Sequence, residues 1–140
     1  MRISTKGRYG LAVMVKLGEQ PTNWVSISTL SQELGLSKIY LEQVLSLLKN
    51  GDLVQSTKGP QGGYRISGST MNVFDILHVL EPALFEHETS VGSNLDLQHI
   101  LVDTVFGPMQ ASLDETLKSI TLESLVAISR SRREEPMFYI

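Results

Sequence analysis

The stretch from Gly35 to Ile66 constrains the fold more than any other part of the sequence. It predicts a helix that ends at Gly51, a short strand, a turn rich in glycine and a returning strand. A helix followed directly by such a hairpin is typical of a winged helix-turn-helix, in which the helix enters a DNA groove and the hairpin contacts the nucleic acid beside it. We therefore expect a surface that binds DNA.

Serine residues precede three predicted helices, as helix-capping residues do. The predicted helices are residues 5–19 after Ser4 or Thr5, 27–34 after Ser26, and 38–50 after Ser37. Gly35 and Leu36 leave only a tight turn between the second and the third, which is the layout of a helix-turn-helix.

The third helix has two distinct faces. Its apolar positions follow the spacing i, i+3, i+4, i+7, which predicts a face on the core: Leu41, Val44, Leu45 and Leu48. The opposite face is mostly polar and is flanked by Lys38 and Lys49; it consists of Ile39, Glu42, Gln43, Ser46 and Asn50. A face that is merely exposed to solvent has the same composition. The hairpin that follows is therefore needed to distinguish a solvent-exposed face from one that contacts DNA.

The predicted hairpin joins Leu53–Ser56 to Gly63–Ile66 through a turn that holds Lys58 near its tip. Glycines and Pro60 make the turn tight, so its backbone can approach another surface closely. A narrow minor groove concentrates negative potential and attracts such a cation. A phosphate-binding loop is excluded, since the turn lacks the Lys-Ser/Thr pair and precedes a strand.

The second half is predicted to be helical. We expect a helix over residues 72–80, an acidic irregular connector over 81–93, a long helix over 94–119 and a last helix over 122–131 capped by Thr121. Gly107-Pro108 predicts either a kink or a division of the long helix. An apolar stripe along this helix predicts a homodimer: Leu97, Ile100, Leu101, Val105, Met109, Leu113 and Leu117.

These patterns predict a mainly α fold with a small β-wing. We expect a winged helix-turn-helix domain over residues 1–66 and a helical dimerisation and effector region with a C-terminal tail over 67–140. The net charge of −3 divides unevenly between them. Residues 1–66 carry eight basic against four acidic side chains, a net +4, while residues 67–140 carry four against eleven, a net −7. The basic half suits a polyanion.

Composition excludes several classes of protein. The sequence has no cysteine, which rules out disulfides and thiolate chemistry. No apolar run approaches the length of about 18 residues that spans a bilayer, and the first residues do not resemble a signal peptide. We therefore expect a cytoplasmic protein. Catalytic triads and phosphate loops are also missing from the pattern, so we do not expect an enzyme.

Four segments carry a family resemblance. They are Ile3–Gly10 (ISTKGRYG), Tyr40–Gln43 (YLEQ), Gly59–Tyr64 (GPQGGY) and Ile120–Leu122 (ITL). With them the sequence resembles the Rrf-type winged-helix regulators, the bacterial family that contains the iron–sulfur-cluster regulator IscR and the cysteine-metabolism repressor CymR. The resemblance extends over essentially the whole chain.

The resemblance implies a set of DNA-binding residues. Glu42, Gln43 and Tyr40 match the positions that face the major groove, and Lys58 matches the cation that enters the minor groove. The full implied set is Thr5, Lys6, Arg8, Tyr9, Ser37, Lys38, Tyr40, Glu42, Gln43, Lys49, Thr57, Lys58, Gln61 and Gly62. Leu47 departs from the family, in which many members carry arginine there.

Cluster-binding members of the family place three cysteines in the connector before the long helix, and this connector has none. His99 keeps the position of the family's histidine ligand, but Asp96 stands in place of the last cysteine. The resemblance therefore implies a regulator without a metal or cofactor. The alternative is a site of oxygen and nitrogen ligands from Glu86, His87, Glu88, Asp96 and His99.

The last four residues, Met137, Phe138, Tyr139 and Ile140, resemble the end of the cysteine-metabolism repressor. That resemblance implies a partner, cysteine synthase, acting as corepressor. An apolar tail that packs on its own dimer is the alternative.

The sequence and the resemblance together predict a homodimeric repressor of cysteine or sulfur-metabolism genes that binds a two-fold-symmetric operator. Two alternatives stay open. One is a cluster-less regulator that senses another signal, such as a metal, a small molecule or stress, and the other is a winged helix that binds proteins.

Overall fold

Serine side chains fix the starts of the first three helices in the computed structural model, which describes residues 2–68, 70–86 and 89–134. The helices are α1 (Thr5–Gly18), α2 (Ile27–Leu34) and α3 (Lys38–Asn50). The hydroxyls of Ser4, Ser26 and Ser37 each accept a hydrogen bond from the backbone three residues ahead. The predicted caps and the helix-turn-helix layout are thereby confirmed, because each serine satisfies a backbone donor that a helix start leaves free.

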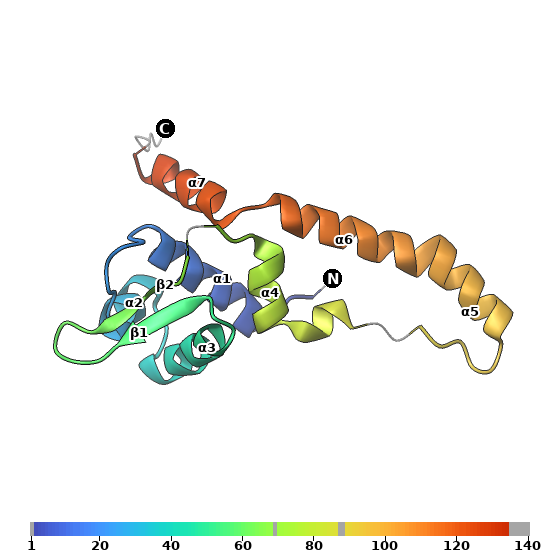
Figure 1. Ribbon diagram of the computed structural model, residues 1–140, viewed down its shortest axis with the longest axis horizontal. Coiled ribbons are helices and arrows are strands. Elements are labelled where there is room, and N and C mark those ends of the chain that lie inside the picture. Colours follow the sequence, from blue (N-terminus) through green and yellow to red (C-terminus); the bar gives the residue numbers. More distant parts are fainter. Residues whose placement is uncertain (1, 69, 87–88, 135–140) are drawn as a thin grey trace, which may run out of the picture.

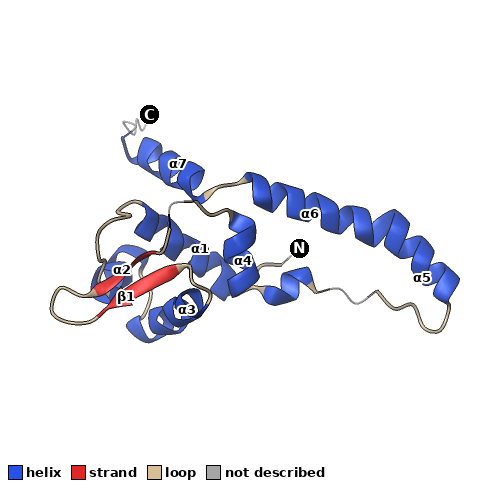
Figure 2. Cartoon of the chain, viewed as in Figure 1, coloured by secondary structure: helices blue, strands red, loops and turns tan. Residues whose placement is uncertain are grey.

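The hairpin consists of two strands, drawn in red in Figure 2, which are β1 (Val54–Thr57) and β2 (Gly63–Ile66). They pair antiparallel with Val54 opposite Ile66. The first strand starts one residue later than predicted. The cause is the turn after α3, in which Asp52 has a φ of 60° and the Leu53 amide still donates to the Leu48 carbonyl. The Leu53 carbonyl still accepts from the Ser67 amide across the hairpin at 3.0 Å, but its own amide is used by the turn.

The second half adds α4 (Val73–Leu80), the short 3-10 helix η1 (Pro82–Phe85) and α7 (Leu122–Glu134). Asn72 and Asp75 cap α4 reciprocally, and the Thr121 hydroxyl accepts from the Ser124 amide at the start of α7. The connector was predicted to be irregular throughout, but residues 82–85 form η1, and its Phe85 stacks on His78 of α4 with ring centroids 3.8 Å apart.

The long helix is continuous from residue 95 to residue 119 (Figure 1). It comprises α5 (Leu95–Leu101), the π-helical segment η2 (Val102–Phe106) and α6 (Gly107–Ser119). Division into two helices, one of the two predicted outcomes, is therefore wrong. The Gly107 amide donates to the Val102 carbonyl five residues back, and this widened turn accommodates Pro108, which has no amide to donate.

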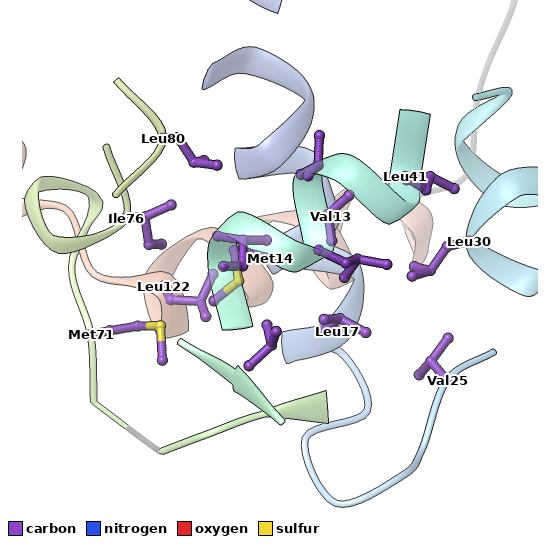
Figure 3. Packing of buried hydrophobic residues seen from close by; sticks show 14 of the residues in the cluster. Val13, Met14, Leu17, Val25, Leu30, Leu41, Met71, Ile76, Leu80 and Leu122 are labelled. Atoms are coloured by element: carbon purple, nitrogen blue, oxygen red, sulfur yellow. The ribbon is translucent and has the colours of Figure 1, made fainter. Parts of the chain in front are cut away.

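The hydrophobic core is built around α1, whose Val13, Met14 and Leu17 are fully buried (Figure 3). Helices α2 and α3 and the hairpin pack on one side of it, while α4 and α7 pack on the other. Met71 and Leu122 belong to the same core, so the buried cluster continues past residue 66. The division into domains at that residue stays a prediction.

Helix α7 extends three residues beyond its predicted end. The side chain of Glu19, at the end of α1, accepts a hydrogen bond from Ser129 at 2.8 Å and forms a salt bridge with Arg133 at 3.2 Å. These contacts hold the last turns of α7 against α1. The long helix contacts α4 near its C-terminal end, where the ammonium of Lys118 lies 4.5 Å from the centre of the Phe74 ring, and the rest of it extends away from the core (Figure 1).

Candidate nucleic-acid interface

The outer face of α3 is exposed along its length. Burial of Leu41, Val44, Leu45 and Leu48 fixes the rotation of the helix. This rotation exposes the predicted side chains on the opposite side, which are Lys38, Ile39, Glu42, Gln43, Ser46 and Lys49. Ser37, which caps the helix, is exposed at its start.

The start of α1 lies against the start of α3. The rings of Tyr9 and Tyr40 meet edge to face with centroids 5.8 Å apart, and the guanidinium of Arg8 lies 5.7 Å from the centre of the Tyr9 ring. Arg8 also donates to the Thr5 hydroxyl at 3.4 Å. Lys6 is exposed on the same first turns. The structure thus brings the predicted residues of α1 and α3 together through one aromatic contact.

Tyr40 is the predicted residue whose placement differs most from its predicted role. Its side chain is half-buried, and its hydroxyl is buried without a hydrogen-bond partner among the described residues. Burial raises the pKa of Tyr40, the neighbouring Tyr9 raises it further, and Arg8 lowers it. In this arrangement the ring supports Tyr9, and the hydroxyl does not point into solvent.

The turn of the hairpin presents Lys58 to solvent, with Thr57 and Gln61 exposed on either side. Gly59 has a φ of 106°, and the Gly62 amide donates to the Gly59 carbonyl at 2.9 Å. This left-handed position requires glycine, because a side chain there would be strained. We call the segment from β1 through this turn to β2 the wing.

A backbone bridge fixes the base of the wing. Val25, just before α2, exchanges two hydrogen bonds of 2.8 Å with Tyr64 of β2. A side chain on Gly63 would come within 2.3 Å of the Val25 carbonyl oxygen. The wing is therefore tied directly to the helix-turn-helix, and its position relative to α3 is set by the backbone.

Two residues outside the predicted interface, Arg65 and Trp24, support the wing. Arg65 donates to Gln55 of the opposite strand at 3.2 Å, and its guanidinium lies 4.1 Å from the centre of the Trp24 ring. The cross-strand pair follows from the hairpin register, which could have indicated it. Trp24 lies in a loop far from the wing in sequence, so no local pattern indicated its role.

Among the described residues, the cations of the candidate interface form no salt bridge. The salt bridges among the described residues join Lys16, Glu19, Glu33 and Arg133, on α1, α2 and α7. None of them involves the cations of the predicted interface, which are Lys6, Arg8, Lys38, Lys49 and Lys58. Cations without acidic partners are free to replace the counterions of a phosphate backbone.

Comparison with known proteins gives the family. Residues 3–128 match the model of the Rrf2 family, described as iron-dependent transcriptional regulators. The chain belongs to the Rrf2 family. It is therefore a DNA-binding transcriptional regulator and not an enzyme.

Individual Rrf2 proteins resemble it along its full length. The chain is 36% identical to the regulator CymR of Bacillus subtilis, with all of both sequences covered. The solved structure of that protein, the global cysteine regulator of B. subtilis, superposes with a TM-score of 0.78 at 32% identity, covering 91% of this chain and 98% of the other. The structure of T. potens IscR gives a TM-score of 0.73 at 30% identity, covering 99% and 95%.

The part of this Rrf2 chain that the structure describes does not fit an iron centre. The sequence has no cysteine, so an iron–sulfur cluster lacks its usual thiolate ligands. Among the described residues, no group of three or more histidine, aspartate or glutamate side chains lies close enough together to hold a metal ion. Asp96 and His99 lie on α5, both exposed. His87 and Glu88, two members of the alternative site, lie outside the described residues.

Two further features bear on the predictions. Within the described part of the chain, no helix has both the length and the hydropathy required to cross a membrane. The segment Met137–Ile140, predicted to bind cysteine synthase, lies outside the described residues.

Proposed function

We propose that this Rrf2 protein acts as a homodimeric repressor that binds a two-fold-symmetric operator through α1, α3 and the wing. The observation that carries the proposal is the joining of these three elements. Tyr9 and Tyr40 join α1 to α3, and the bridge between Val25 and Tyr64 joins the wing to the helix-turn-helix. Rigid placement of three basic elements allows one protomer to contact neighbouring grooves together.

Each element has a distinct role in the proposal. Gln43 of α3 is suited to a bidentate contact with adenine, and Glu42 to a contact with the amino group of cytosine. Lys58 enters the flanking minor groove. Phosphates are held by the remaining proposed residues, which are Thr5, Lys6, Arg8, Tyr9, Ser37, Lys38, Lys49, Thr57, Gln61 and the Gly62 amide. Tyr40 contributes by supporting Tyr9.

The long helix supplies the proposed dimer contact. Ile100 is 58% exposed and Met109 64% exposed, although both are large and apolar. Leu97 and Val105 continue this exposed apolar surface, which we call the long-helix stripe. Apolar area of this kind is stabilised by burial against a second copy, and two-fold pairing places two recognition helices on one operator.

The choice of regulated genes rests on likeness. CymR is the global cysteine regulator of B. subtilis, and it resembles this chain along its full length. The lack of cysteine here also disfavours regulation through an iron–sulfur cluster. We therefore propose cysteine or sulfur-metabolism genes as the targets, in the bacterial cytoplasm at the nucleoid.

Nuclease footprinting on the DNA upstream of the protein's own gene and of sulfur-assimilation genes tests the proposal. We expect a protected, two-fold-symmetric sequence that overlaps a promoter, and lower transcription from that promoter in vitro. Protection together with raised transcription would make the protein an activator. No protection of either fragment would contradict the choice of targets.

The proposed corepressor is cysteine synthase, bound through Met137–Ile140. Size-exclusion chromatography of cysteine synthase with the full chain, and with a variant that ends at Pro136, tests this partner. We expect cysteine synthase to share a peak with the full chain but not with the variant that ends at Pro136. Separate peaks for the full chain would rule out this partner and leave another signal to be found.

A further inference from the structure

Ile39 is the most exposed large hydrophobic side chain in the described part of the protein, at 72%. The other exposed large hydrophobic side chains of the described residues all lie on the helices from α5 onward; they are Leu95, Leu97, Ile100, Val105, Met109 and Ile128. Ile39 therefore does not belong to the long-helix stripe. A single exposed hydrophobic residue is ordinary on a protein surface, so the position of Ile39 has to carry the argument.

Ile39 is the second residue of α3. The Ser37 hydroxyl accepts from the Tyr40 amide at 3.1 Å, which fixes the first turn of the helix. The ring of Tyr40 packs on Tyr9 of α1. Since neighbouring helical residues point about 100° apart, Ile39 points away from that contact and shares a face with Gln43, four residues ahead.

The first turn of a recognition helix supplies the side chains that reach base edges in the major groove. An isoleucine there offers no hydrogen bond and can only make an apolar contact. Among the four bases, thymine alone presents a methyl group in the major groove, while the other bases present mainly hydrogen-bond donors and acceptors. The chemistry of Ile39 therefore matches thymine.

We propose that Ile39 is a specificity-determining residue that contacts the C5-methyl group of one thymine in each operator half-site. Ile39 lies one turn of α3 before Gln43, which contacts a different base. The proposal rests on the proposed function, since it requires α3 to lie in the major groove. Glu42 and Gln43 then select by hydrogen bonds, and Ile39 selects by apolar contact.

The test uses DNA whose thymine methyl groups are removed one at a time. The full-length protein first selects its preferred duplex from a random pool. Each thymine of one half-site is then replaced by deoxyuridine, which removes only the methyl group, and affinity is measured by fluorescence anisotropy. The same duplexes are measured with Ile39→Ala and with the control Ile128→Ala, which shortens an exposed isoleucine on α7, outside the interface.

We expect one thymine at which deoxyuridine weakens binding of the wild type about fourfold, the value of one buried methyl group. Ile39→Ala should bind the two duplexes equally, whereas Ile128→Ala should keep the wild-type ratio. The inference would be overturned if deoxyuridine lowered the affinity of the wild type and of Ile39→Ala by the same factor. It would also be overturned if no single replacement of thymine by deoxyuridine changed the affinity of the wild type. A pool without any enriched sequence would instead overturn the proposed function, and this inference with it.

Discussion

At the scale of single residues, Tyr40 shows how a side chain on the recognition helix can serve the interface indirectly. Its hydroxyl is buried without a partner among the described residues, and its ring supports Tyr9. A buried hydroxyl that lacks a hydrogen bond costs about 1–3 kcal/mol, so the ring explains the position of Tyr40 better than the hydroxyl does.

Removing the Tyr40 hydroxyl should therefore be tolerated. Tyr40→Phe should keep or raise the free energy of unfolding at neutral pH, by up to about 1 kcal/mol, because it removes an unsatisfied group and keeps the ring. Tyr40→Leu should lower it, since the contact with Tyr9 is lost. Urea denaturation measures both. A loss in Tyr40→Phe equal to that in Tyr40→Leu would show that the hydroxyl is bonded in solution.

The pH dependence of stability gives a second measure of the same burial. The raised pKa means that the folded state favours the protonated hydroxyl. This contribution is fully present below the unfolded pKa of about 10 and is lost as the pH rises through the folded pKa. In urea denaturation from about pH 9 to pH 11, the wild type should lose more stability than Tyr40→Phe. Parallel curves would contradict the assignment.

Lys58 is the residue on which the role of the wing depends. Lys58→Ala should weaken operator binding and reduce the salt dependence of log Kd by about 0.9 for each wing that contacts DNA. Anisotropy titrations at several salt concentrations measure both quantities. Arg132→Ala, which removes a cation from the exposed end of α7, is the matched control and should change neither. Unchanged affinity and slope in Lys58→Ala would exclude the wing from the interface.

Local chemistry predicted which residues of α3 are exposed, but not what each one does. Apolar spacing placed Leu41 and Leu45 in the core, and this sets the outer face. The contact of Tyr40 with Tyr9, and that of Arg65 with Trp24, depend on segments distant in sequence. Packing between distant segments leaves no periodic pattern, so only the structure could find these pairs.

At the scale of elements, the wing depends on close approach of two backbones. Gly63→Ala would place a methyl group within 2.3 Å of the Val25 carbonyl oxygen, a backbone atom that cannot move freely. We expect a loss of about 1–3 kcal/mol in the free energy of unfolding. DNA binding should also weaken, because the added methyl group pushes the wing away from Val25 and thus from the helix-turn-helix.

Gly68→Ala is the control for that experiment. Gly68 has open space around its missing side chain, so alanine there should be neutral or stabilising by about 0.4–1 kcal/mol. Thermal unfolding followed by circular dichroism measures both variants. Equal stability of Gly63→Ala and Gly68→Ala would contradict the proposed bridge between β2 and Val25.

Element boundaries were predictable where one side chain decides them. Ser26 and Ser37 cap their helices as predicted. The long helix was not predictable in the same way, because the sequence around Pro108 is compatible with a kink, a break or a widened turn. Its continuity depends on the hydrogen bond from Gly107 to Val102, a π-helical choice that local propensity does not specify.

At the scale of the whole molecule, the long-helix stripe is the least explained surface of a single chain. Met109→Glu should shift the protein from dimer to monomer, because a carboxylate in a buried apolar contact would be desolvated. Ala111→Glu adds the same charge to an exposed position of α6 on the other side of the helix and should leave the dimer intact. Sedimentation velocity measures both, and a monomeric wild type would contradict the stripe as the dimer contact.

Hydroxyl-radical footprinting tests most directly the central claim that α1, α3 and the wings of two protomers form one DNA-binding surface. On the duplex selected by the wild type, we predict two symmetric blocks of protection about one helical turn apart, with flanking minor-groove protection that disappears in Lys58→Ala. A single asymmetric block, or flanking protection that persists in Lys58→Ala, would contradict this account.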